Sequence, residues 1–150
     1  MPVKQISQTQ DLTKKAKNFL LSYVNLQREL DLKIERLSIL EQRIREKPAY
    51  RPVDSPDALQ RDISEHVVME ADMRGEILRH MENLRNPEER AVIQLRYLDR
   101  FDWVLVCAGL YYAAPDFETN TGRYMKKMFR MHGRALAALS ASLNMLEMSG

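Results

Sequence analysis

The placement of proline constrains the fold of this chain more than any other feature. The six prolines are Pro2, Pro48, Pro52, Pro56, Pro87 and Pro115, and long stretches without proline lie between them. Inside a helix, proline removes a backbone donor and clashes with the preceding turn, so helices have to lie between these positions. Glycine is also sparse, with 5 residues. The pattern predicts an all-α fold rather than a β fold with many turns.

Residues 10–47 have the clearest helical pattern. Their apolar residues recur at steps of three and four, which places them on one face of a helix. They are Phe19, Tyr23, Leu26, Leu30, Ile34, Leu37, Leu40 and Ile44. The stripe is close to a coiled-coil seam, and Lys33 interrupts it where an apolar residue is expected. The helix is about 50 Å long, so we expect the stripe to join two copies of the chain in a homodimer; coverage within one chain is the alternative.

A second helix is expected after the three clustered prolines, which force the chain to turn. Ser55 has N-cap chemistry and Pro56 suits the first helical position, so this helix runs to about Leu84. Its apolar positions are Leu59, Ile63, Val67, Met73, Ile77, Met81 and Leu84. Residues 1–85 are therefore predicted to form a long, coiled-coil-like antiparallel hairpin that serves oligomerisation.

Residues 86–150 are predicted to form a second part, built from shorter helices. Asn86, Pro87 and Glu89 have the pattern of a helix N-terminus with a capping box. We expect this helix to end near Leu98 and to bury Ala91, Val92, Leu95 and Leu98. Asp102 can cap a following helix over residues 103–110, which is so apolar that we expect deep burial, with Trp103 in the core.

The last helix, from residues 119–122 to about Met148, has a basic face. Arg123, Lys126, Lys127, Arg130 and Arg134 share one side, and Tyr124, Met128, Met131, Ala135, Leu139 and Leu143 mark the other. Residues 118–139 contain five lysines and arginines and one acidic residue, a local charge of +4 in a chain of +2. This concentration suits a helix that enters the major groove of DNA, although a solvated basic face is the simpler alternative.

Several motifs between residues 86 and 139 carry a family resemblance. In chain order they are Leu95 to Asp99, Asp102-Trp103, Asp116-Phe117 and Tyr124 to Leu136. With these motifs the chain resembles a family of small phage and prophage proteins related to late-transcription regulators of the ArpU and RinA type. The resemblance implies a helix-turn-helix similar to region 4 of bacterial sigma factors. The chain departs from that pattern in its apolar third helix and in about ten extra residues, 111–120, which enlarge the turn before the basic helix.

Together, the basic face and the resemblance predict a DNA-binding regulator of phage late genes, most simply an activator. The expected partners are double-stranded DNA, a second copy of the chain and, as a further candidate, RNA polymerase. The five basic residues would contact phosphates and bases, and Thr119, Asn120 and Thr121 would supply donors at the helix start. Two alternatives remain open: a DNA-packaging protein like a terminase small subunit, and a protein-interaction factor that keeps the fold without binding DNA.

Other functions find little support in the residue pattern. Cys107 is the lone cysteine, which indicates a reducing compartment, and neither a signal core nor an apolar run of about 18 residues is present. We therefore expect a cytoplasmic protein in a bacterial host, away from membranes. Two histidines, His66 and His80, sit about 21 Å apart along one helix and cannot share a metal. For His132 we expect packing or a phosphate hydrogen bond. We predict no metal, no cofactor and no enzymatic activity.

Overall fold

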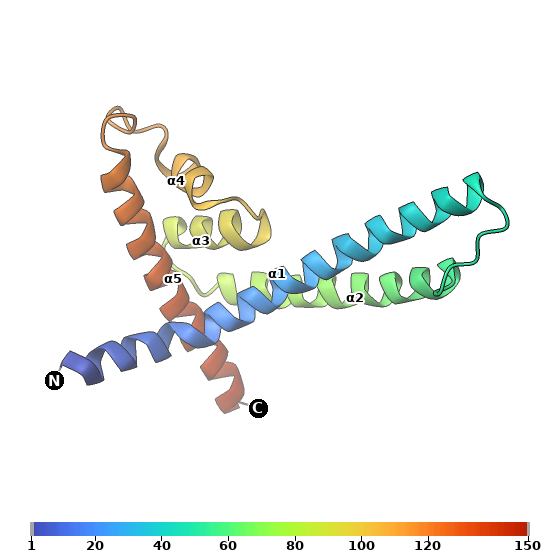
Figure 1. The fold of residues 1–150 in the computed structure, drawn as a ribbon. Helices are drawn as coiled ribbons and strands as arrows, with labels where there is room; N and C mark the ends of the chain where they lie inside the picture. The colour runs from blue at the N-terminus through green and yellow to red at the C-terminus, as the bar shows by residue number, and fades with distance from the viewer. Residues whose placement is uncertain (1, 150) are drawn as a thin grey trace. The chain divides into compact units, whose positions relative to one another are not determined.

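The structure, a computed structural model, describes residues 2–149, and the side chains of residues 12–145. Its elements are α1 (Pro2–Glu46), α2 (Pro56–Met81), α3 (Pro87–Ile93), the π-helical turn η1 (Gln94–Leu98), α4 (Trp103–Tyr111) and α5 (Thr121–Ser149) (Figure 1). No strand occurs between residues 2 and 149. The prediction of an all-α fold is confirmed for this part of the chain.

The helix ends follow local sequence signals closely. The Ser55 hydroxyl accepts the Ala58 N–H at 3.1 Å, as expected for the N-cap of α2. Asn86 caps α3 by accepting the Glu88 N–H at 2.8 Å, and Asp102 caps α4 by accepting the Leu105 N–H at 2.9 Å. Two bounds differ from expectation: α1 begins at Pro2 instead of near residue 10, and α2 ends at Met81, three residues before Leu84.

By its internal contacts the chain divides into two units, which we describe separately. One comprises residues 23–75, and the other comprises residues 1–22 together with residues 76–150. Both long helices, α1 and α2, therefore contribute to both units. The sequence predicts a division at residue 85 between an oligomerisation part and a DNA-binding part. That division concerns function rather than internal contacts, and it stays a prediction.

In the unit of residues 23–75, α1 and α2 run antiparallel. The Tyr23 hydroxyl donates to Glu70 at 2.7 Å, and the Lys33 ammonium lies 2.9 Å from Asp62. Residue numbers thus rise along α1 while they fall along α2, which is the order of an antiparallel pair (Figure 1). Leu30 and Leu59 are buried between the helices. We call the contact between α1 and α2 in this unit the hairpin seam.

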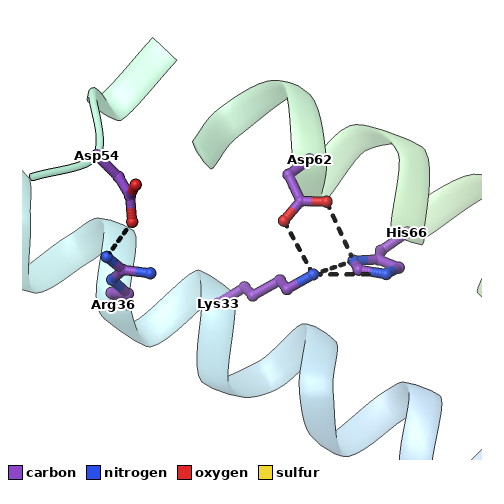
Figure 2. A network of polar contacts seen from close by, with 5 residues as sticks. All are labelled: Lys33, Arg36, Asp54, Asp62 and His66. Carbon is purple, nitrogen blue, oxygen red and sulfur yellow. Dashed lines mark hydrogen bonds and ion pairs between the residues drawn. The ribbon is translucent and has the colours of Figure 1, made fainter. Parts of the chain in front are cut away.

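The hairpin seam passes through Lys33 rather than Ile34. The Ile34 side chain is 48% exposed, whereas the Lys33 side chain is 27% exposed and contacts α2 (Figure 2). With Lys33 in place of Ile34, the positions on α1 from residue 23 to residue 44 follow alternating steps of three and four, the spacing of a heptad. The expectation that Ile34 belongs to the buried stripe was wrong. Lys33 does occupy a seam position where an apolar residue was expected, and its partly buried ammonium is satisfied by the facing helix.

The other unit has an apolar core formed by several helices. Pairs among α3, α4 and α5 are in contact, and Val92, Ile93, Val106 and Met128 are fully buried there. The N-terminal part of α1 joins this core through Ala16 and Leu20, and the end of α2 joins it through Ile77. Polar contacts reinforce the packing; for example, Ser142 on α5 lies 2.7 Å from His80 Nδ1 and accepts from Asn83 at 2.8 Å.

The end of the third helix differs from expectation. The α-helix gives way at Gln94 to a π turn, in which the Asp99 N–H donates to the Gln94 carbonyl at 2.8 Å. Arg100 then adopts a positive φ of 61°, and the Phe101 N–H reaches back to the Leu95 carbonyl at 3.0 Å. The wider turn rotates the following residues. Val92 is buried as expected, and Ile93, just before the π turn, is buried as well. Tyr97 is the buried residue within the turn, whereas Ala91, Leu95 and Leu98, which we expected to be buried, are only partly buried.

The expected deep burial of α4 was also wrong. Val106, Cys107 and Tyr111 are buried, but Val104 is 69% and Leu105 53% exposed. Trp103 is only partly buried and packs at the edge of the core. The helix is apolar on both faces, while the neighbouring helices cover only one of them. Apolar composition alone therefore overestimated how much of α4 is covered.

Candidate nucleic-acid interface

The basic residues of α5 form one outward face. At 100° per residue, the five positions fall within an arc of about 100°, and they extend over about 16 Å of the helix axis. Four of them, Arg123, Lys126, Arg130 and Arg134, are exposed. Lys127 is partly buried, because its ammonium lies over the Tyr111 ring, 5.0 Å from the ring centroid. We call these five residues the basic face.

The opposite side of α5 holds the helix in a fixed orientation. Met128 and Ala135 are fully buried, and Leu136 and Leu139 are nearly so. This agrees with the expected core side of the helix, and the exposed Met145 lies outside it at 72% exposure. Because the apolar side is fully engaged, rotation of α5 would expose core residues. The basic face therefore stays turned toward solvent.

An aromatic cluster anchors the middle of α5. His132 Nε2 lies 2.7 Å from the Tyr97 hydroxyl, and the His132 ring also meets Trp103 edge to face at 4.7 Å between centroids. Arg96 covers the Trp103 ring at 4.4 Å. Burial, with a smaller contribution from the charges of Lys17 and Arg96, lowers the pKa of His132 to about 4. The neutral ring can accept a hydrogen bond from the Tyr97 hydroxyl, and the contacts of His132 seen here lie within the aromatic cluster.

The enlarged turn before α5 is folded around Asp116. The Asp116 carboxylate accepts hydrogen bonds from the Tyr124 hydroxyl on α5 and from the Asn120 side chain, the latter at 3.2 Å. Its backbone carbonyl accepts the Thr119 hydroxyl at 3.1 Å. The hydrogen bond from Tyr124 is the main reason that the pKa of Asp116 is lowered, although burial opposes it. Residues 112–120 are thus tied to the first turns of α5.

This turn changes what the start of α5 can offer to an anion. The side chains of Thr119 and Asn120, which we expected to bind phosphate, make hydrogen bonds to Asp116. Thr121 is exposed, as are Arg123 and Lys126 in the turns that follow it. The Asp116 carboxylate also places negative charge beside the helix N-terminus, where phosphate would otherwise be favoured. Cationic contacts are therefore better supplied by the basic face than by the helix start.

Sequence reasoning missed the residues that position α5. Asp116 and Arg96 were noted only as parts of motifs, and Tyr124 only as part of a motif and of the apolar side of the last helix, although these side chains hold the turn and the aromatic cluster. A local signal existed for Asp116, because aspartate often caps turns through its own side chain. No local signal indicated the pairing of Tyr97 with His132, which are 35 residues apart.

The predicted oligomerisation stripe lies mostly against the chain itself. Tyr23 and Leu30 are buried, and Ile34 is exposed. The remaining members, Phe19, Leu26, Leu37, Leu40 and Ile44, are partly buried. A dimer built on this stripe would require α2 to leave the hairpin seam or to be exchanged between copies. The predicted homodimer itself stays a prediction.

An open apolar groove lies in the same unit as the basic face. Its walls come from η1, the loop that follows it, α4 and the turn 112–118, and include Leu95, Phe101, Leu105 and Tyr112. Gly109 lies in the wall, and a Cβ there would meet a Leu95 methyl group at 3.2 Å. The absence of a side chain at Gly109 therefore lets η1 and α4 approach closely.

Two further findings concern ligands and membranes. Among the residues that the structure describes, no three histidine, cysteine, aspartate or glutamate side chains are grouped so that they could hold a metal ion. His66 contacts Lys33 and Asp62, and His80 contacts Ser142. Within the same residues, no helix has the length and apolar character needed to span a bilayer.

The site thus consists of a rigidly held helix with a row of cations facing outward, beside an ordered turn and an apolar groove. The surface is elongated and carries a row of positive charges. Neither the protein-family models, nor the curated proteins, nor the solved structures contain a match to this chain.

Proposed function

We propose that this protein binds double-stranded DNA through the basic face of α5 and regulates the late genes of a phage. The observation that carries the proposal is the row of cations on the side of α5 that faces away from its buried side. Lysine and arginine side chains that neutralise phosphates supply most of the affinity of proteins for DNA. The family resemblance supplies the regulatory role, and the bacterial cytoplasm is where that role would be performed.

Within this proposal the basic residues have different tasks. The major groove is about 12 Å wide and admits a helix, and arginine is the most common reader of guanine there. Arg130 is at the centre of the basic face and is our choice for base contact, while Arg123, Lys126 and Arg134 would bind phosphates. Lys127, which lies over Tyr111, would contribute charge and help to hold α5 against α4.

Fluorescence anisotropy with labelled late-promoter DNA tests the proposal. We expect the logarithm of the binding constant to fall with the logarithm of salt concentration, with a slope of about −3 for each bound copy if Arg123, Lys126 and Arg134 contact phosphate. Arg130→Ala should lower affinity about tenfold, and Arg123→Ala should reduce the slope by about 1. Arg45→Ala removes an exposed arginine from the other unit and serves as the control, without loss of binding. Absent or salt-insensitive binding would contradict the proposal.

A homodimer belongs to this proposal, because paired recognition helices commonly read paired half-sites. Sedimentation of the chain with and without DNA gives the subunit number. A ring of eight or more subunits would instead favour a packaging role like that of a terminase small subunit.

The apolar groove favours one other candidate function, in which the protein acts by binding another protein. Exposed apolar grooves commonly mark such contacts, and RNA polymerase is the partner that the proposed regulatory role implies. Leu105→Glu should then abolish capture of purified polymerase while DNA affinity is unchanged. Capture of polymerase without any DNA binding would favour this candidate over the first.

A further inference from the structure

The hairpin seam contains a partly buried polar network where a simple coiled coil would have apolar residues. The Lys33 ammonium lies 2.7 Å from His66 Nδ1 and 2.9 Å from Asp62 Oδ2, and His66 Nδ1 lies 3.7 Å from Asp62 Oδ1 (Figure 2). Because ammonium has only donors, His66 Nδ1 acts as its acceptor. The side chains of His66, Lys33 and Asp62 are 17%, 27% and 46% exposed, so the network lies at the edge of the seam. Lys33 therefore depends on α2 for its partners.

A second polar contact crosses the same seam. The buried Tyr23 hydroxyl on α1 donates to Glu70 on α2 at 2.7 Å and accepts from Gln27 at 2.9 Å. The Glu70 side chain is 13% exposed and also lies 3.4 Å from Arg74. The polar seam residues of α2, His66 and Glu70, are thus each met by a complementary group on α1. The apolar residues of α1 and α2 could be matched in several registers of the helix pair. Polar groups that match at two places favour one of these registers.

Other pairings of α1 would leave these groups without partners. If α2 moved by one heptad, Lys33 would lose Asp62 and His66, and Glu70 would lose the Tyr23 hydroxyl. If α1 paired in parallel with α1 of a second copy, two Lys33 ammonium groups would face each other at one level of the seam. A partly buried charge that loses its counter-charge and acceptor is unfavourable, and two like charges at one level of a seam repel each other. Both alternatives are therefore penalised although the rest of the stripe is apolar.

We propose that the network of Lys33, Asp62 and His66 selects the partner of α1: it favours α2 in the register seen here and opposes pairing of α1 with a second copy of itself. Lys33 is the selective element, because it is the basic residue within the seam of α1. The inference concerns which surface remains for self-association and does not rest on DNA binding. A homodimer of the full chain would then use surfaces outside the hairpin seam.

Sedimentation equilibrium of the full chain tests this selectivity. Lys33→Leu makes the seam of α1 apolar from Leu26 to Ile44, and we expect self-association to tighten at least tenfold relative to the wild type. Lys14→Leu is the matched control, since it removes the same charge from an exposed position of the same helix. That variant should associate like the wild type. Lys33→Met, which keeps an unbranched side chain, should behave like Lys33→Leu.

Three outcomes would overturn the proposal. The first is equal self-association of Lys33→Leu, Lys33→Met and the wild type. The second is equal tightening in Lys14→Leu, which would indicate a general effect of added apolar surface. The third is loss of helix content, by circular dichroism, in both variants at residue 33, because a selective contact is not required for folding and apolar replacements of buried charge are generally tolerated. DNA affinity enters none of these readouts.

Discussion

The hairpin of residues 23–75 and the basic helix α5 use charged residues in opposite ways. In the hairpin, Lys33 and Glu70 lie in the seam and are satisfied across it by the facing helix. In α5 the buried side is apolar around Met128, and the charges of Arg123 and Arg130 face solvent. A charge inside a seam acts on which helices pair, whereas a charge outside leaves the helix free to meet a partner molecule. Charged residues on amphipathic helices thus serve two purposes here, one inside the hairpin seam and one on the exposed side of α5.

The largest expected effect tests whether α5 is held by its apolar side. Met128→Ala removes a fully buried side chain, and we expect the free energy of unfolding to fall by about 3 kcal/mol. Met145→Ala is the matched control on the same helix, because Met145 is 72% exposed and should change stability by less than about 0.5 kcal/mol. Urea titration monitored by circular dichroism measures both. Similar losses in the two variants would show that the buried side of α5 has been assigned to the wrong residues.

A smaller expected effect concerns one histidine in each region, His132 on α5 and His66 in the hairpin. The pKa of His132 in the folded protein is about 4, below the ordinary value of 6.5, because the ring is buried. Folding favours the neutral form of His132. The contribution of His132 to the free energy of unfolding is therefore complete above pH 6.5, and it is lost as the pH falls from 6.5 through 4. After allowance for partial exposure, this loss should be about 2 kcal/mol.

Variants at the two histidines sharpen that test. His132→Phe keeps an aromatic ring against Trp103 and should remove most of this pH dependence from the free energy of unfolding. His66→Gln alters the hairpin seam and should leave the His132 contribution in place. If His132→Phe unfolds with the same dependence on pH as the wild type between pH 6.5 and 4, His132 is not the titrating group.

The predictability of each region follows from the range of its interactions. Ser55, Asn86 and Asp102 bond to backbone groups two or three residues away, so the helix starts could be predicted from sequence. The two sides of α5 were also predictable, since periodicity is local. The folded turn could not be predicted, because Asp116 finds Tyr124 only once the chain has turned. The exposure of Leu105 depends on where neighbouring helices end, which composition does not reveal.

Lys33 and Ile34 show the same limit at neighbouring positions. Hydropathy assigns the apolar residue to the seam, but the strict heptad spacing through Leu30 and Leu37 selects residue 33. The choice between the two criteria depends on Asp62 and His66, which lie on another helix and offset the cost of burying an ammonium group. Sequence pattern alone therefore could not decide it.

The smallest expected effect tests this assignment directly. Ile34 is 48% exposed, so Ile34→Ala should change the free energy of unfolding by less than about 0.5 kcal/mol. Leu30→Ala, four residues earlier and buried in the seam, should cost about 2 kcal/mol or more. Both variants are measured by urea unfolding at a single protein concentration, so that self-association contributes equally. A loss at Ile34 as large as that at Leu30 would mean that the seam passes through Ile34, and the role assigned to Lys33 would fail with it.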